Sequence, residues 1–135
     1  MRKTGLLVAV AGILLSTVVP VLAHHAFSAE FDQSKPIKLS GEITKLEWVN
    51  PHAWIFVDVK GADGKVVGWR FEMGAPNALL KSGWSKSDIK PGTAVTISGF
   101  QARAGGPVAN AYQVRLPDGR DLFAASSLKD PAGGK

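Results

Sequence analysis

The chain has little of the chemistry on which many small proteins depend. Of its 135 residues none is cysteine, three are histidine and one is tyrosine. Without cysteine, no disulfide crosslinks the fold, and no thiolate serves as a nucleophile or a metal ligand. The sequence also lacks a nucleophile elbow, a phosphate-binding loop, a zinc-protease helix and a dinucleotide fingerprint. We therefore expect a binding protein rather than an enzyme.

A concentration of positive charge is also missing. The 16 lysines and arginines exceed the 11 aspartates and glutamates, which gives a formal net charge of +5. Two of the basic residues, Arg2 and Lys3, fall at the very start, and the others are interspersed with acidic residues without forming a run. Proteins that bind nucleic acid cluster their basic residues on one face or along one helix. A nucleic-acid partner is therefore not expected.

The first 23 residues have the pattern of a secretory signal peptide. Arg2-Lys3 precedes an apolar stretch over residues 5–19, and Val21-Leu22-Ala23 then has the small-x-small form of a cleavage site. The stretch is shorter than the roughly 20 residues that a membrane-spanning helix needs, and no later segment is apolar enough. We expect cleavage after Ala23, a periplasmic or secreted protein, and no transmembrane segment in the mature chain.

Cleavage after Ala23 gives the mature chain an N-terminal histidine. The free amine and the imidazole of His24 can then close one chelate ring on a metal ion. Nitrogen ligands suit copper, with zinc as the second choice. The other two histidines are His25 and His52, so the sequence predicts a metal site made of His24, His25 and His52. The alternative is an N-terminal segment that holds no metal and a turn histidine that hydrogen-bonds at the opening of a strand.

The middle of the chain alternates with the period of β-strands. Residues 37–48 form the first predicted strand, and its phase slips by one near Thr44, which is typical of a β-bulge. Residues 52–60 and 66–73 form the next two strands, which are joined by a Gly-Ala-Asp-Gly turn. If Gly64 adopts the left-handed conformation, Val57 pairs with Trp69 and Ile55 with Phe71. A two-residue turn would instead flip every side chain to the other face, and we favour the first register.

The remaining pattern completes a known strand order. Pro76 suits the first turn of a short helix and Gly83 suits its C-terminal cap. Strands are predicted over residues 93–102, 110–116 and 121–124. The order β-β-β-α-β-β predicts an all-β protein with one short helix, an OB-fold-like Greek-key barrel of five to six strands. The predicted parts are a signal peptide, a lead-in segment, an OB-like domain and a flexible tail, over residues 1–23, 24–36, 37–126 and 127–135.

Strands two and three place aromatic and charged residues on their outer face, which is a common ligand surface of this fold. With a neighbouring tryptophan they form a candidate surface for a glycan or a partner protein: Trp48, Trp54, Phe56, Arg70 and Glu72. Glu72 is of special interest because we expect its face to carry His52 as well. The alternative is that Phe27 and Phe31 of the lead-in segment cover these aromatics as a second small core. We favour that alternative because an uncovered aromatic patch is a liability on a soluble protein.

From residue 23 to about 126 the chain resembles a family of small exported bacterial proteins of unknown function. The resemblance rests on His24-His25-Ala-Phe near the mature start and on Asn50-Pro-His52-Ala-Trp54, with further matches at Glu30-Phe-Asp, Gly74-Ala-Pro-Asn-Ala-Leu79, Gly83-Trp84, Lys90-Pro-Gly92 and Leu116-Pro-Asp-Gly119. It implies an exported OB-like domain, and it brings no established activity and no catalytic residues.

Two functions follow from these expectations. The favoured one is capture of copper or a similar metal ion by the histidines in a periplasmic binding protein. The alternative is an accessory module that binds a periplasmic partner protein or a glycan through the aromatic face and uses no metal.

Overall fold

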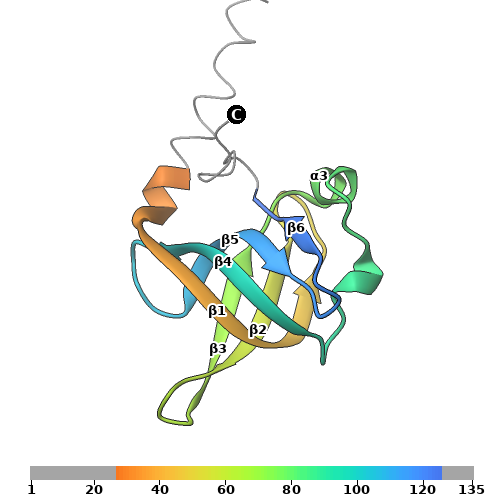
Figure 1. The fold of residues 1–135 in the computed structure, drawn as a ribbon. Helices are drawn as coiled ribbons and strands as arrows, with labels where there is room; N and C mark the ends of the chain where they lie inside the picture. The colour runs from red at the N-terminus through yellow and green to blue at the C-terminus, as the bar shows by residue number, and fades with distance from the viewer. Residues whose placement is uncertain (1–26, 126–135) are drawn as a thin grey trace, which may run out of the picture.

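The computed structural model describes residues 27–125, and in them five strands close into a ring (Figure 1). The strand order is β3-β2-β1-β4-β5-β6, and a further pairing between β3 and β5 closes the ring and leaves β6 at its side. The strands are β1 (Phe31–Glu47), β2 (Trp54–Lys60), β3 (Val66–Glu72), β4 (Ala94–Ala102), β5 (Val108–Arg115) and β6 (Asp121–Phe123). The predicted all-β, OB-like fold with one short helix is therefore confirmed.

Strand β1 serves both halves of the ring. Its residues 37–42 pair with β4, and its residues 42–47 pair with β2. At the changeover the strands approach so closely that a Cβ on Gly41 would lie 2.2 Å from the backbone oxygen of Asp58. The pairing with β2 then shifts by one between Ile43 and Lys45. This shift is the predicted β-bulge, and it explains why the apolar phase slips there.

The hairpin of β2 and β3 has the register that the sequence favoured. Ile55 pairs with Phe71 and Val57 with Trp69, and Gly64 has a φ of 79°. The residues that alternate with these face outward from the ring. The far end of the hairpin extends beyond the ring, and Val66 there is exposed (Figure 1). At its other end β3 runs parallel to β5 over three residue pairs.

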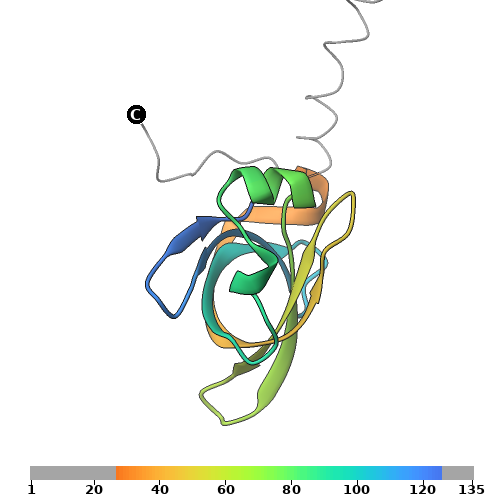
Figure 2. The same ribbon diagram turned by 90° about the vertical axis from the view of Figure 1, so that its right-hand side faces the viewer.

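The segment between β3 and β4 crosses one open end of the ring (Figure 2). It contains the short helix α3 (Pro76–Lys81) and the 3-10 turn η1 (Lys86–Asp88). Leu79, Trp84 and Ile89 of this segment are buried in the main core with the inward residues of the strands. The indole nitrogen of Trp84 also donates a hydrogen bond to the backbone oxygen of Phe123, at 2.7 Å. The segment thereby closes the core and ties β6 to it.

The aromatic residues of the predicted lead-in segment form a second core, but not at the predicted place. Residues 27–30 form a helical turn, and β1 begins directly afterwards at Phe31 rather than at residue 37. Phe27 and Phe31 are buried against Phe100 and Ala102 of β4. The expectation that they form this core over the aromatic residues of β2 and β3 is therefore wrong, because the pairing of Phe31 with Ala102 places them against β4.

No helix in the described part of the chain is long and apolar enough to cross a membrane.

Candidate functional site

A histidine and a buried carboxylate meet at the end of the β2–β3 hairpin. Glu72 is the last residue of β3, and His52 stands two residues before β2. Two backbone hydrogen bonds of Ala53, with Met73 and Gly74, continue the pairing of the strands past this point. The Nδ1 atom of His52 lies 2.7 Å from Oε1 of Glu72, and the two side chains are 39% and 8% exposed. The prediction that Glu72 shares its face with His52 is thus met by a direct contact.

Glu72 carries its carboxyl group in an environment that disfavours charge. Burial raises the pKa of Glu72 above its ordinary value, the neighbouring His52 opposes that rise, and the negative charge of Glu30 adds to it. Behind the pair, Asn110 is fully buried and donates from Nδ2 to the backbone oxygen of Glu72, at 3.4 Å. The interaction with His52 is therefore the main compensation for burying this carboxylate.

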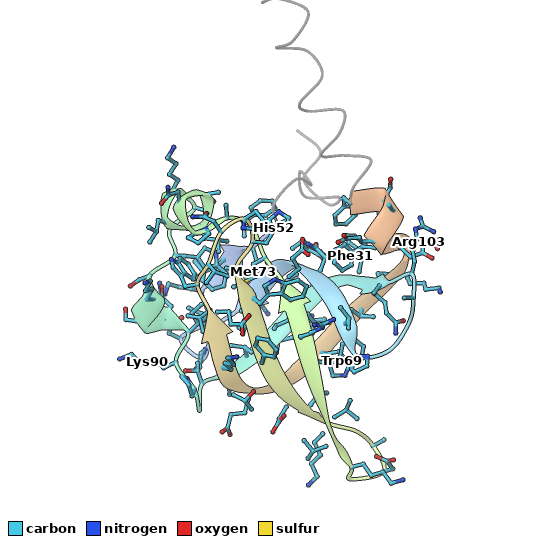
Figure 3. The ribbon with its side chains drawn as sticks, turned by 180° about the vertical axis from the view of Figure 1, so that it is seen from behind. Phe31, His52, Trp69, Met73, Lys90 and Arg103 are labelled. Atoms are coloured by element: carbon cyan, nitrogen blue, oxygen red, sulfur yellow. The ribbon has the colours of Figure 1, made fainter. Side chains whose placement is uncertain are left out.

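The contact with Glu72 also decides which nitrogen of His52 is left for another partner. Since Nδ1 faces the carboxylate, Nε2 is the nitrogen that remains. A histidine that binds a metal ion almost always has its other ring nitrogen on a carboxylate, a backbone carbonyl or a water molecule, which fixes the tautomer and the orientation of the ring. In Figure 3, His52 lies at the same end of the molecule as the helical turn of residues 27–30. The contact therefore fixes the ring of His52 through a carboxylate and leaves Nε2 for another partner.

The other two predicted ligands, His24 and His25, lie outside the described residues, as do the predicted signal peptide and the whole of the predicted tail. Within residues 27–125 no three histidine, aspartate or glutamate side chains are grouped so as to hold a metal ion. The structure thus brings His52 and Glu72 together, and the three-histidine site stays a prediction.

A cavity of about 520 Å³ adjoins Glu72. Its walls come from the helical turn, from β2 and β3, and from the connection between β4 and β5. Charged and aromatic residues dominate the lining: Glu30, Phe31, Trp54, Arg70, Glu72 and Arg103. The cavity therefore joins the segment before β1 to the outer face of the hairpin.

The aromatic rings of that outer face are covered by cations. The guanidinium of Arg70 lies 5.4 Å from the ring centroid of Trp54, and Nζ of Lys45 lies 5.2 Å from that of Phe56. Both distances are within the range of a cation–π interaction. Trp48 packs against the main core instead. Of the predicted ligand surface, the structure gathers Trp54, Arg70 and Glu72 around the cavity and places Trp48 and Phe56 outside its lining.

Two charged residues of the cavity, Glu30 and Arg103, were not predicted as part of any site. They belong to the helical turn and to the connection after β4, which the backbone hydrogen bond from Arg103 to Glu30 brings together, at 2.8 Å. No local pattern marks either residue, because their proximity depends on the pairing of segments about seventy positions apart.

Comparison with known proteins gives one match. A family model described as "Family of unknown function (DUF6152)" matches residues 11–110. Neither the curated proteins nor the solved structures include a protein with a significant match to the chain. A function must therefore be argued from the residues of the site.

Proposed function

The chain belongs to this family of unknown function, and we propose that it is an exported protein that binds a copper ion or a similar metal ion through His52 and its mature N-terminus. The observation that carries the proposal is the 2.7 Å contact between Nδ1 of His52 and Glu72. This contact fixes the imidazole and leaves Nε2 as the ligand atom. The buried position of Glu72 makes the contact selective, since few other partners reach that carboxylate.

The position of the helical turn supports a meeting of the N-terminus with His52. Glu30 lines the same cavity as Glu72 and lies close enough to influence its pKa. His24 stands six residues before Glu30. Six residues span at most about 20 Å when fully extended, which is sufficient for the chain to turn back toward the His52 end of the cavity.

The chemistry of the three groups suits copper. Cleavage after Ala23 would give His24 a free amine, and this amine and its imidazole form a chelating pair. Nε2 of His52 adds a third nitrogen, and His25 can replace either imidazole. A set of nitrogen ligands favours Cu(II) among the common divalent ions, and zinc is the second choice.

The test combines intact mass and calorimetry on the exported protein. The mass fixes the first residue, and titration with Cu(II) gives the affinity. We expect a chain that begins at His24 and an affinity that falls at least 10-fold in His24→Ala and in His52→Ala. The double variant should lose little more, because ligands of one site are not independent. One glycine added before His24 should weaken binding as much as His24→Ala, since it displaces the amine and leaves every side chain in place.

A carboxylate variant separates the supporting role of Glu72 from general effects of charge. Glu72→Gln should weaken Cu(II) binding by about 10- to 100-fold, as loss of a supporting partner usually does. The matched control is Glu47→Gln, which removes a carboxylate of β1 that pairs with Lys45 of the same strand. Copper binding that is unchanged by both His52→Ala and the added glycine would refute the proposal.

The metal-independent module is the less favoured function. A stacking platform for a sugar needs open aromatic faces, whereas Arg70 and Lys45 cover the rings of Trp54 and Phe56.

A further inference from the structure

Arg70 forms no ion pair with any carboxylate of residues 27–125, although two carboxylates line the same cavity. Among the described arginines, Arg103, Arg115 and Arg120 each have a carboxylate oxygen within 4 Å, at 3.8, 2.6 and 2.7 Å. For Arg70 no carboxylate oxygen of the described residues comes within that limit. Its side chain is nevertheless beside the cavity that Glu30 and Glu72 line. The guanidinium therefore has its hydrogen-bonding capacity available to a ligand.

The position of Arg70 is fixed before any ligand arrives. Its backbone nitrogen donates to the backbone oxygen of Pro107, at 3.1 Å, and Arg70 pairs with Phe56 of the neighbouring strand β2. The stacking on Trp54 further restricts the side chain. A guanidinium presents its N–H groups as a rigid fork that matches a carboxylate. Arg70 is thus a preorganised carboxylate receptor, for which little ordering is needed on binding.

The remaining walls determine what the carboxylate is attached to. Phe31, Ala102 and Val108 supply apolar surface. The volume of about 520 Å³ falls within the range of roughly 300 to 1,000 Å³ that is usual for small-molecule sites. Acetate or inorganic phosphate would fill only a small part of this space, whereas an acid with a ring would also bury apolar surface.

The two glutamates restrict the ligand further. Glu30 and Glu72 both line the cavity, and Glu30 lies close enough to raise the pKa of Glu72, so a second acidic group of a ligand placed near them would be repelled. Arg103 adds positive charge beside the helical turn, where its Nε donates to the backbone oxygen of Ser28, at 2.6 Å. The cavity therefore suits a ligand with a single carboxylate at one end and an uncharged body.

We propose that this cavity is a binding site for a small organic monocarboxylate with a planar apolar body. Arg70 pairs with the carboxylate, and Phe31, Ala102 and Val108 line the part of the cavity that receives the apolar body. The proposal does not depend on the metal proposal, because the groups assigned to the ligand are Arg70 and the apolar walls, and His52 is not among the residues that line the cavity.

The test uses benzoate as the probe and the full mature chain with a metal chelator present. Titration followed by NMR or calorimetry should show saturable binding of benzoate and at least 10-fold weaker binding of benzamide, which lacks the charge, and of acetate, which lacks the ring. Arg70→Met should weaken benzoate binding at least 10-fold. The affinity of Arg70→Lys for benzoate should fall between those of the wild type and Arg70→Met, because an ammonium cannot form the paired hydrogen bonds of a guanidinium.

The matched control is Arg115→Met, which removes an exposed arginine of β5 away from the cavity and should leave benzoate binding unchanged. Near-ultraviolet circular dichroism checks that each variant is folded. The proposal is overturned if benzoate does not saturate at millimolar concentration, if acetate binds as well, or if Arg70→Met and Arg115→Met have equal effects. It is also overturned if an acetylated peptide ending in phenylalanine binds far more tightly than benzoate in an Arg70-dependent way, since the site would then receive peptide C-termini.

Discussion

Replacing Phe31 by alanine tests whether the segment before residue 37 is a structural part of the domain. The ring of Phe31 is 3% exposed, and its centroid lies 5.4 Å from that of Phe27. Phe27 in turn meets Phe100 edge-on at 6.4 Å. The substitution removes the ring at the point where β1 begins and where the second core is attached to β4. We expect a large loss of stability and no change in secondary structure.

The magnitude follows from burial and from the space left behind. Removing a fully buried phenylalanine side chain costs about 3 to 5 kcal/mol. The lower end applies here because the second core is small and Phe27 can move into the space. A loss of about 3 kcal/mol lowers the melting temperature of a domain of this size by roughly 12 °C or more. The same change should increase access to the cavity that Phe31 lines.

Urea unfolding followed by tryptophan fluorescence measures this free energy directly. The matched control is Phe123→Ala, because Phe123 is 38% exposed and its side chain is largely outside the core. The control should cost about 1 kcal/mol or less. A cost for Phe31→Ala below that of Phe123→Ala would refute the assignment of a second core and would reopen the possibility that the segment is only loosely attached.

Two further substitutions test the backbone and the charges of the ring. Gly99→Ala should lower the free energy of unfolding by about 3 kcal/mol or more, since a Cβ there would lie 1.7 Å from the backbone oxygen of Asn110. The control Gly68→Ala, where the nearest atom would be 3.7 Å away, should be nearly neutral. Equal losses of the two variants in denaturant unfolding would contradict this. The hydrogen bond from Arg120, together with that from the backbone of Ser85, lowers the pKa of Asp88 in the folded state. The ionised Asp88 therefore stabilises the fold above its unfolded-state pKa, and this stabilisation is lost as the pH falls through its folded-state pKa. The stability difference between wild type and Asp88→Asn should therefore shrink below about pH 4, and a difference that is constant down to pH 2 would refute that role.

Much of the ring could be predicted because its determinants are local. The alternation of apolar and polar residues predicted the strands, and the left-handed conformation expected of Gly64 predicted the register in which Val57 pairs with Trp69. The phase slip near Thr44 marked the bulge, because a bulge changes the side-chain period of a single strand. These features need no knowledge of distant residues.

The start of β1 was not predictable in this way. Residues 32–35 are polar, those from 33 onward are exposed, and Pro36 removes a backbone donor, so the stretch has no apolar alternation. It is extended because β4 pairs with Phe31 and Pro36 at its two ends, from sixty or more positions away in the sequence. The same distance explains the misplaced second core: the sequence indicated that Phe27 and Phe31 pack on the domain, but only the pairing with Ala102 determines where.

For the site, the sequence indicated which residues share a face of the sheet but not which side chains contact each other. Alternation placed Arg70 and Glu72 on one face with His52 at its edge. The 2.7 Å contact of His52 with Glu72 and the stacking of Arg70 on Trp54 depend on strand twist and on side-chain rotamers. The metal ligands His24 and His25 stay a prediction that only the exported chain can test.

The double pairing of β1 has a consequence for the order in which the fold forms. The half of β1 that pairs with β2 finds its partner within about fifteen residues, as when Glu42 meets Asp58. The half that pairs with β4 must wait for residues 94–102, as when Ile37 meets Gly99. On a growing chain the early half of β1 is thus an open strand edge until most of the domain has been made. Closing so long a loop slows folding, and an open edge can pair with other chains, so the interval before β4 emerges is when this chain is most exposed to aggregation.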